Sequence, residues 1–117
     1  MDLNGIWITE IHGPYDIQSI GVLVLESGRV CGGNNNLYIR GHYGTEDDDV
    51  KLTLDLVFYG PDRSLFGEPE REIGVEIVGK YNKRKGTITG EVYRGDNLEW
   101  RMQIQLTRRA DLPLPPE

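Results

Sequence analysis

The sequence predicts an all-β protein, an eight-stranded antiparallel up-and-down barrel, and three observations support this prediction. Helical periodicity is missing, and short runs with apolar residues at every second position take its place. Clusters of Gly, Asn, Asp or Pro separate the runs, and such short turns make neighbouring strands pair antiparallel. Closure into a barrel removes exposed sheet edges, so we expect the barrel rather than a two-layer sandwich of the same strands.

Eight extended runs can be read along the chain. The predicted strands cover residues 5–12, 19–26, 29–33, 37–44, 50–59, 71–81, 87–94 and 98–108. Ser27-Gly28 and Asp96-Asn97 suit tight hairpins, and Gly60-Pro61-Asp62 breaks the chain after the fifth strand. Residues 1–110 are therefore expected to form a single barrel domain. Residues 111–117 (DLPLPPE) are expected to form a Pro-rich tail that cannot pair in a sheet.

Alternation within the strands separates the expected core from the surface. The inward positions of the fifth, sixth and eighth predicted strands are Val50, Leu52, Leu54, Leu56 and Phe58; Ile73, Val75, Ile77 and Gly79; and Leu98, Trp100, Met102, Ile104 and Leu106. The first two runs, GIWITEI and SIGVLVLE, are apolar on both faces. Such strands need a cover outside the barrel as well as a core inside it, and an intersubunit contact is one natural cover.

Composition narrows the classes of function. The net charge of −6 argues against direct binding of nucleic acid, which needs a positive footprint. The single cysteine, Cys31, cannot form an internal disulfide, which fits a reducing compartment. The first residues, MDLNGIWITE, lack the pattern of a signal peptide, and no apolar run approaches the roughly 20 residues that span a bilayer. We therefore expect a cytoplasmic protein that does not enter membranes.

Four consecutive carboxylates, Glu46, Asp47, Asp48 and Asp49, precede the fifth predicted strand. They suit a metal site, a solvated hairpin tip that protects an apolar strand from aggregation, or a docking site for a basic protein. A calcium loop needs alternating oxygen ligands, a central glycine and a later Glu, which this segment lacks, so no metal is expected. Adjacent exposed like charges repel by a few tenths of a kcal/mol per pair. Replacing all four by alanine should therefore leave stability equal or higher.

No catalytic signature is found, and neither an enzyme nor a cofactor is expected. There is no G-x-S-x-G sequence or comparable nucleophile motif. His12, His42 and Cys31 lie on three different predicted strands without the spacing of zinc ligands. Lys83-Arg84-Lys85 is expected to be a solvated turn because the chain as a whole is acidic.

The barrel interior is expected to be a packed core, because eight strands leave little more room than their own side chains fill. A cavity for a small apolar ligand is the alternative, since Gly79 and Gly90 share the parity of inward residues and carry no side chain. The residues of such a cavity would be Phe58, Gly79, Gly90, Trp100 and Met102.

Four stretches carry a resemblance to a known bacterial family. GIWITEI, GVLVLESGRVCGGNNNLYIRGHYG, TITGEVY and MQIQLTRRADLP resemble the GrlR-like negative regulators of type III secretion, over residues 5 to about 112. The resemblance implies a small lipocalin-like barrel that forms homodimers and binds a transcriptional activator through a surface motif of alternating Glu and Asp. Glu46-Asp47-Asp48-Asp49 (EDDD) occupies the matching place. A weaker resemblance, to calycins, implies that Trp7 and Arg108 or Arg109 pack together and close one barrel end.

Together these features predict a non-enzymatic regulatory module that acts by protein–protein interaction. Residues 46–49 would dock a basic, transcription-activator-like partner, and the mechanism would be steric and electrostatic sequestration in competition with DNA. The alternative is a lipocalin-like carrier of a small apolar ligand.

Overall fold

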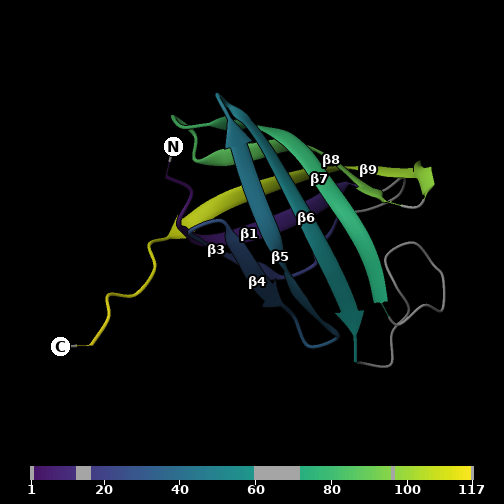
Figure 1. Ribbon diagram of the computed structural model, residues 1–117, viewed down its shortest axis with the longest axis horizontal. Coiled ribbons are helices and arrows are strands. Elements are labelled where there is room, and N and C mark those ends of the chain that lie inside the picture. The colour runs from purple at the N-terminus through teal and green to yellow at the C-terminus, as the bar shows by residue number, and fades with distance from the viewer. Residues whose placement is uncertain (1, 13–16, 60–71, 96, 117) are drawn as a thin grey trace.

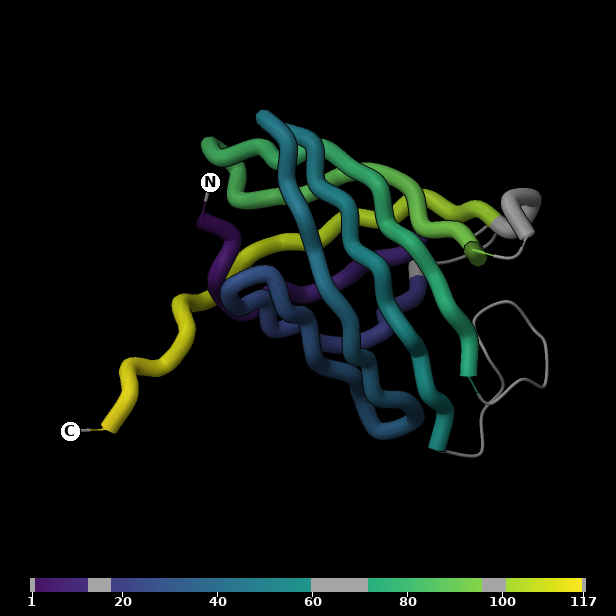
Figure 2. Tube along the Cα trace, in the orientation of Figure 1, coloured from purple at the N-terminus to yellow at the C-terminus, as the bar shows by residue number. Residues whose placement is uncertain are grey.

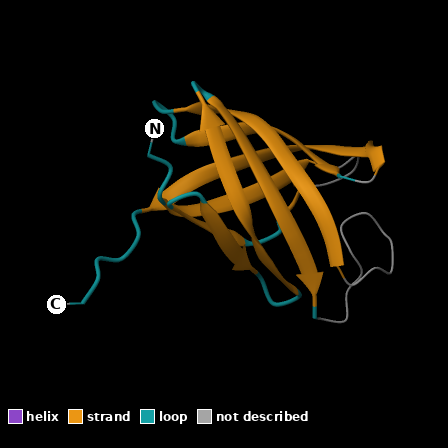
Figure 3. Ribbon diagram, viewed as in Figure 1, coloured by secondary structure: helices purple, strands orange, loops and turns teal. Residues whose placement is uncertain are grey.

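Every regular element in the computed structural model is a β-strand, as Figure 1 and Figure 3 show for the described residues 2–12, 17–59, 72–95 and 97–116. The strands are β1 (Gly5–His12), β2 (Ile17–Gln18), β3 (Val22–Glu26), β4 (Arg29–Gly33), β5 (Leu37–Glu46), β6 (Asp49–Phe58), β7 (Glu72–Asn82), β8 (Thr87–Arg94) and β9 (Asn97–Ala110). Within these ranges no helix is long and apolar enough to cross a membrane.

The strands form a closed barrel with up-and-down connectivity. Apart from the two-residue β2, which pairs with the end of β1, each strand pairs antiparallel with the next in sequence, from β1 and β3 through to β9. The barrel closes because β9 also pairs with β1, with Trp7 opposite Arg108 and Ile11 opposite Ile104. Figure 2 shows this closure as the purple and yellow strands lying side by side. The predicted eight-stranded antiparallel barrel is therefore confirmed.

The core lies where strand alternation places it. Along β6 every second residue from Val50 to Phe58 is buried, and along β7 the inward positions Ile73, Val75, Ile77 and Gly79 are buried. In β9, Ile104 and Leu106 are buried and Met102 packs against the core from a partly buried position. The side chains of Leu98 and Trp100 lie outside the described part of the chain.

The second predicted strand was placed too early, because β3 begins at Val22 instead of at residue 19. The cause is the hydroxyl of Thr9, a residue that is only 2% exposed. This hydroxyl hydrogen-bonds the backbone of residues 20 and 21, which come directly before β3, in place of a strand partner. It accepts a hydrogen bond from the Ile20 N–H at 3.1 Å and donates one to the Gly21 carbonyl at 2.9 Å. Gly21 has a left-handed φ of 97°, which ends the extended run.

The outer faces of β1 and β3 are apolar, as the sequence indicates. Ile8 lies opposite Val22 and Ile6 opposite Val24 in the ladder between these strands. Ile6, Ile8 and Val24 are half-buried, and Val22 is 41% exposed. After β9 the chain leaves the barrel wall, and residues 111–116 run away from it without strand structure (Figure 2).

Candidate functional site

The acidic residues lie at the tip of the β5–β6 hairpin, at the top edge of the barrel in Figure 1. Glu46 ends β5 and pairs with Asp49, the first residue of β6, so that only Asp47 and Asp48 form the turn. Asp47 has a left-handed φ of 55°, a conformation that Asp tolerates better than most residues because its short side chain bonds locally. The Asp48 carbonyl accepts a hydrogen bond of 2.8 Å from the Tyr81 N–H of β7, which ties the tip to the neighbouring strand.

The four carboxylates are not equivalent, although all four residues are exposed. Asp49 forms an ion pair with Lys80, its register partner on β7, and the two side chains remain 60% and 73% exposed. The Asp49 carboxylate raises the pKa of Lys80, first by its hydrogen bond and then by its charge. The side chains of Glu46, Asp47 and Asp48 form no hydrogen bond or ion pair with the described residues, although the charges of Asp48 and Asp47 also help to raise the pKa of Lys80. Three carboxylates therefore face solvent at one end of the hairpin, and one is held by a lysine.

Sequence reasoning identified the acids and missed their neighbours. Lys80 and Val78 lie on β7, about thirty positions further along the chain, and come next to the hairpin only through the β6–β7 register, in which Asp49 opposes Lys80 and Lys51 opposes Val78. Alternation marks both residues as outward-facing, and this is the only signal that the sequence offers for them.

The residues proposed for a ligand cavity do not converge on one point. Gly79 pairs with Gly90 on β8 and with Val50 on β6. Phe58 lies eight positions from Val50 along β6, which corresponds to about 26 Å at roughly 3.3 Å per residue. Met102 pairs with Val92, and the Trp100 side chain lies outside the described residues.

The two glycines of this set mark a close approach of strands. A Cβ atom on Gly90 would lie 2.0 Å from the Val78 carbonyl oxygen, and one on Gly79 would lie 2.7 Å from that of Thr89. The space beside these glycines is thus occupied by backbone of the neighbouring strand.

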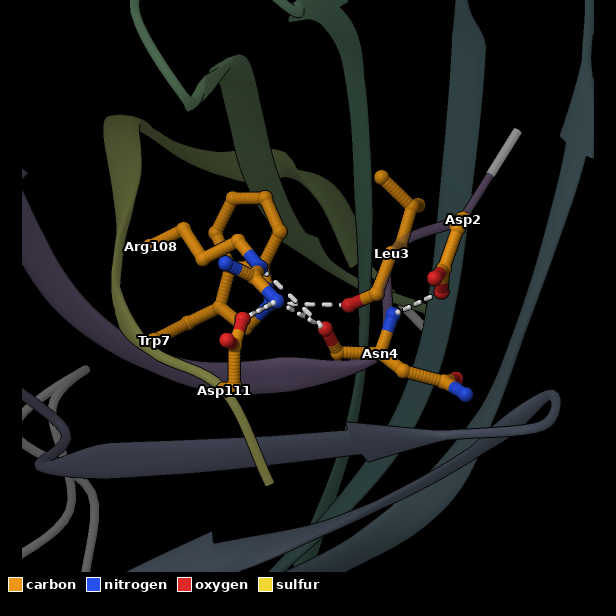
Figure 4. Close-up of polar contacts among 6 residues, drawn as sticks. All are labelled: Asp2, Leu3, Asn4, Trp7, Arg108 and Asp111. Carbon is orange, nitrogen blue, oxygen red and sulfur yellow. Dashed lines mark hydrogen bonds and ion pairs between the residues drawn. The ribbon is translucent and has the colours of Figure 1, made fainter. Parts of the chain in front are cut away.

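One barrel end is covered by a network around Asn4 (Figure 4). Arg108 donates to the Asn4 carbonyl through Nε at 3.1 Å and Nη2 at 2.8 Å, and Nη2 also pairs with Asp111 at 2.6 Å. Trp7, which is completely buried, donates from its indole nitrogen to the Leu3 carbonyl at 3.0 Å. The backbone positions of Trp7 and Arg108 are register partners. This arrangement gives both residues a structural role at the barrel end.

The other singled-out residues do not form a site together. Among the described residues no group of three or more His, Cys, Asp or Glu side chains is placed to hold a metal ion. Cys31 is exposed on the outer face of β4, opposite Arg40 of β5, and His42 lies two positions further along β5.

Comparison with known proteins leaves the family open. Neither a scan against protein-family models nor a search of curated proteins finds a match for this chain. The fold and the site define a closed antiparallel β-barrel that presents an acidic hairpin tip, and the resemblance to GrlR-like regulators stays a prediction.

Proposed function

We propose that this protein is a regulatory binding module that captures a basic protein partner through Glu46, Asp47 and Asp48. The proposal rests on the difference in ion pairing among the four acidic side chains. Asp49 has a lysine partner, whereas the other three carboxylates point to solvent from a rigid hairpin without a partner among the described residues.

Rigidity of the tip supports this proposal. The hairpin has ten paired positions between β5 and β6, and β6 is paired with β7 over most of its length. Charges fixed on such a scaffold lose little conformational freedom when a partner binds, so less of the binding energy is consumed in ordering them. Uncompensated negative charge also accelerates the encounter with a positively charged surface such as that of a DNA-binding protein. Occupation of that surface by the barrel would exclude DNA.

The test uses a variant that removes charge and keeps shape, Glu46→Gln/Asp47→Asn/Asp48→Asn. The immobilised wild-type protein and the variant are compared for capture of DNA-binding proteins from the same genome, followed by affinity measurements with the purified partner. We expect the wild type to bind, added salt to weaken binding, and DNA carrying the partner's site to compete. The variant should lose at least tenfold in affinity.

A matched control separates the site from the overall charge. Glu10→Gln/Asp55→Asn/Glu72→Gln removes three carboxylates from the outer wall, where these residues form no ion pair with the described side chains. It should bind like the wild type. Equal loss in both triple variants would show that net charge alone drives capture, and no loss in either would remove the hairpin from the mechanism.

We also propose that the chain forms a homodimer through the outer faces of β1 and β3. The support is the cross-strand apolar patch of Ile6, Ile8, Val22 and Val24, in which Val22 is 41% exposed and the other three are half-buried. Light scattering coupled to size exclusion should report a dimer for the wild type and a monomer for Val22→Asp, with unchanged circular dichroism. A monomeric wild type would contradict the dimer while leaving the acidic hairpin tip untouched.

The carrier alternative receives no comparable support. The buried apolar side chains of the described core are at most 5% exposed, with Phe58 the most accessible, and Met102 packs against them from a partly buried position. A solvent-filled ligand cavity among them would leave its lining atoms accessible.

A further inference from the structure

We propose that the partner binds with a short extended segment in which basic residues are followed by an apolar residue, and that this segment lies in a groove on the outer face of β5 to β9 with Val78 as its apolar floor. This inference rests on the proposed function and specifies the kind of partner that the hairpin tip selects.

Two neighbouring hollows make up the groove. One, of about 500 Å³, lies directly beside the acidic tip and is lined by residues that include Gly44, Lys51 and Val78. The other, of about 520 Å³, continues over β7, β8 and β9 and is lined by residues that include Val78, Glu91 and Tyr93. Asp49 and Val78 line both, so the two hollows lie side by side.

Register explains the direction of the groove. Gly44 lies opposite Lys51, Lys51 opposite Val78, Val78 opposite Glu91, and Glu91 opposite Gln103. This row crosses five strands, and the four spacings of about 4.8 Å between them give a span of about 19 Å, which is the length of roughly six residues of extended peptide. The groove therefore accommodates a short linear segment.

The floor of the groove is apolar at Val78, two positions along β7 from Lys80, the register partner of Asp49. Val78 is 44% exposed, although it occupies the middle of a paired strand. Two strands away in the same row, a Cβ atom on Gly44 would find no other atom within 4 Å, so that space is open. An apolar side chain of the partner placed at Val78 would cover this valine, and another side chain of the same segment would occupy the open space at Gly44.

Charge decides which end of the bound segment is basic. Each described cation of the groove is engaged by a carboxylate: Lys80 by Asp49, Lys51 by Glu76 at 3.7 Å, and Arg101 by Glu91 at 3.3 Å. The carboxylates without an ion-pair partner among the described residues are those of Glu46, Asp47 and Asp48, and they all lie at the hairpin tip beside the first hollow. Basic residues of the partner belong at that end, and its apolar residue belongs at Val78.

The same charges disfavour occupants from this chain itself. The C-terminal stretch DLPLPPE carries two acids and no base, and a second copy of the chain has a net charge of −6. Both would bring negative charge to the acidic tip. A basic segment of another protein is the occupant with complementary charge.

The experiment measures fluorescence anisotropy with two labelled synthetic peptides. One has three arginines followed by Leu-Thr-Leu, and the other has Ser-Thr-Ser in place of the last three residues. We expect the wild type to bind the leucine peptide about tenfold more tightly than the serine peptide. Val78→Thr, which keeps the β-branched shape, should weaken the leucine peptide by about three- to tenfold, and Gly44→Val should block it by filling the hollow.

Val57→Thr is the matched control, because Val57 is also an outward-facing valine in a paired strand and lies near the end of β6 that is remote from the acidic tip. It should bind both peptides like the wild type.

The possible results separate the inference from the proposed function. Equal binding of both peptides, insensitive to Val78→Thr and Gly44→Val but lost in Glu46→Gln/Asp47→Asn/Asp48→Asn, would overturn the groove and leave the acidic tip as the binding site. Failure of the wild type to bind the leucine peptide would also overturn the groove. Binding that the triple variant does not change would overturn both the groove and the proposed function.

Discussion

Replacement of Gly90 by alanine should destabilise the barrel strongly, because the methyl group would enter the backbone of β7. Its Cβ atom would lie 2.0 Å from the Val78 carbonyl oxygen and 2.5 Å from Gly79 Cα, whereas ordinary contact begins near 3.4 Å. The two strands must therefore separate by more than about 1 Å at the centre of their ladder, where neither contact atom belongs to a side chain that can rotate away. Overpacking of this kind costs about 1–3 kcal/mol and occasionally more. We expect about 3 kcal/mol here, since backbone has to move.

Urea unfolding followed by tryptophan fluorescence measures this loss, and a loss of about 3 kcal/mol corresponds to a melting temperature lowered by roughly 10–15 °C in a domain of this size. Gly74→Ala is the control, because Gly74 lies in the neighbouring strand β7 and its nearest neighbour atom would be 4.0 Å from the new Cβ. That variant should be neutral or gain up to about 1 kcal/mol. If Gly90→Ala were as stable as Gly74→Ala, the steric reasoning would be wrong and room for a ligand beside Gly90 would become credible.

The remaining predictions concern single contacts of the surface and the barrel end. Arg108→Ala should lower the free energy of unfolding by about 2 kcal/mol through loss of its two hydrogen bonds to Asn4, and Arg108→Lys should not restore it; urea unfolding of the two variants decides this. The raised pKa of Lys80 means that its pairing with Asp49 contributes stability below pH 10.5 and loses that contribution as the pH rises through the folded-state pKa. Lys80→Gln should therefore be less stable than the wild type at neutral pH, and melting curves at strongly alkaline pH should coincide. Glu46→Gln/Asp47→Asn/Asp48→Asn should melt at the same temperature as the wild type or slightly higher, because repulsion among neighbouring carboxylates is relieved. A clear decrease would reveal structural partners for these acids.

The barrel was predictable because its signal is local. Strand alternation repeats every two residues, so β6 and β7 show their buried faces in the sequence itself, and short turns then fix antiparallel pairing. The predicted start at residue 19 failed for an equally physical reason. A buried threonine hydroxyl is invisible to hydrophobic patterning, yet Thr9 satisfies the backbone of residues 20 and 21 in place of a strand partner.

The candidate site was predictable only in part. The acids stand next to one another in the sequence, whereas Lys80 and Val78 join them through the register of a strand pair whose connection lies outside the described residues. No local rule sets that register, because it depends on which apolar face each strand buries along its whole length. For the same reason the row from Gly44 to Gln103 cannot be read from composition or spacing.

The pairing of Asp49 changes how the acidic motif has to be tested. Removal of all four carboxylates removes a surface ion pair and uncompensated charge together, and alanine at position 47 adds backbone strain of about 1 kcal/mol because Asp47 has a left-handed φ of 55°. A drop in stability after that change would come from Asp49 and Asp47, and a loss of binding would come from the exposed carboxylates. Amide substitutions at Glu46, Asp47 and Asp48 remove charge that is available to a partner and keep the ion pair of Asp49 with Lys80 in place. Binding and stability are therefore separable at this hairpin, because they depend on different members of one contiguous motif.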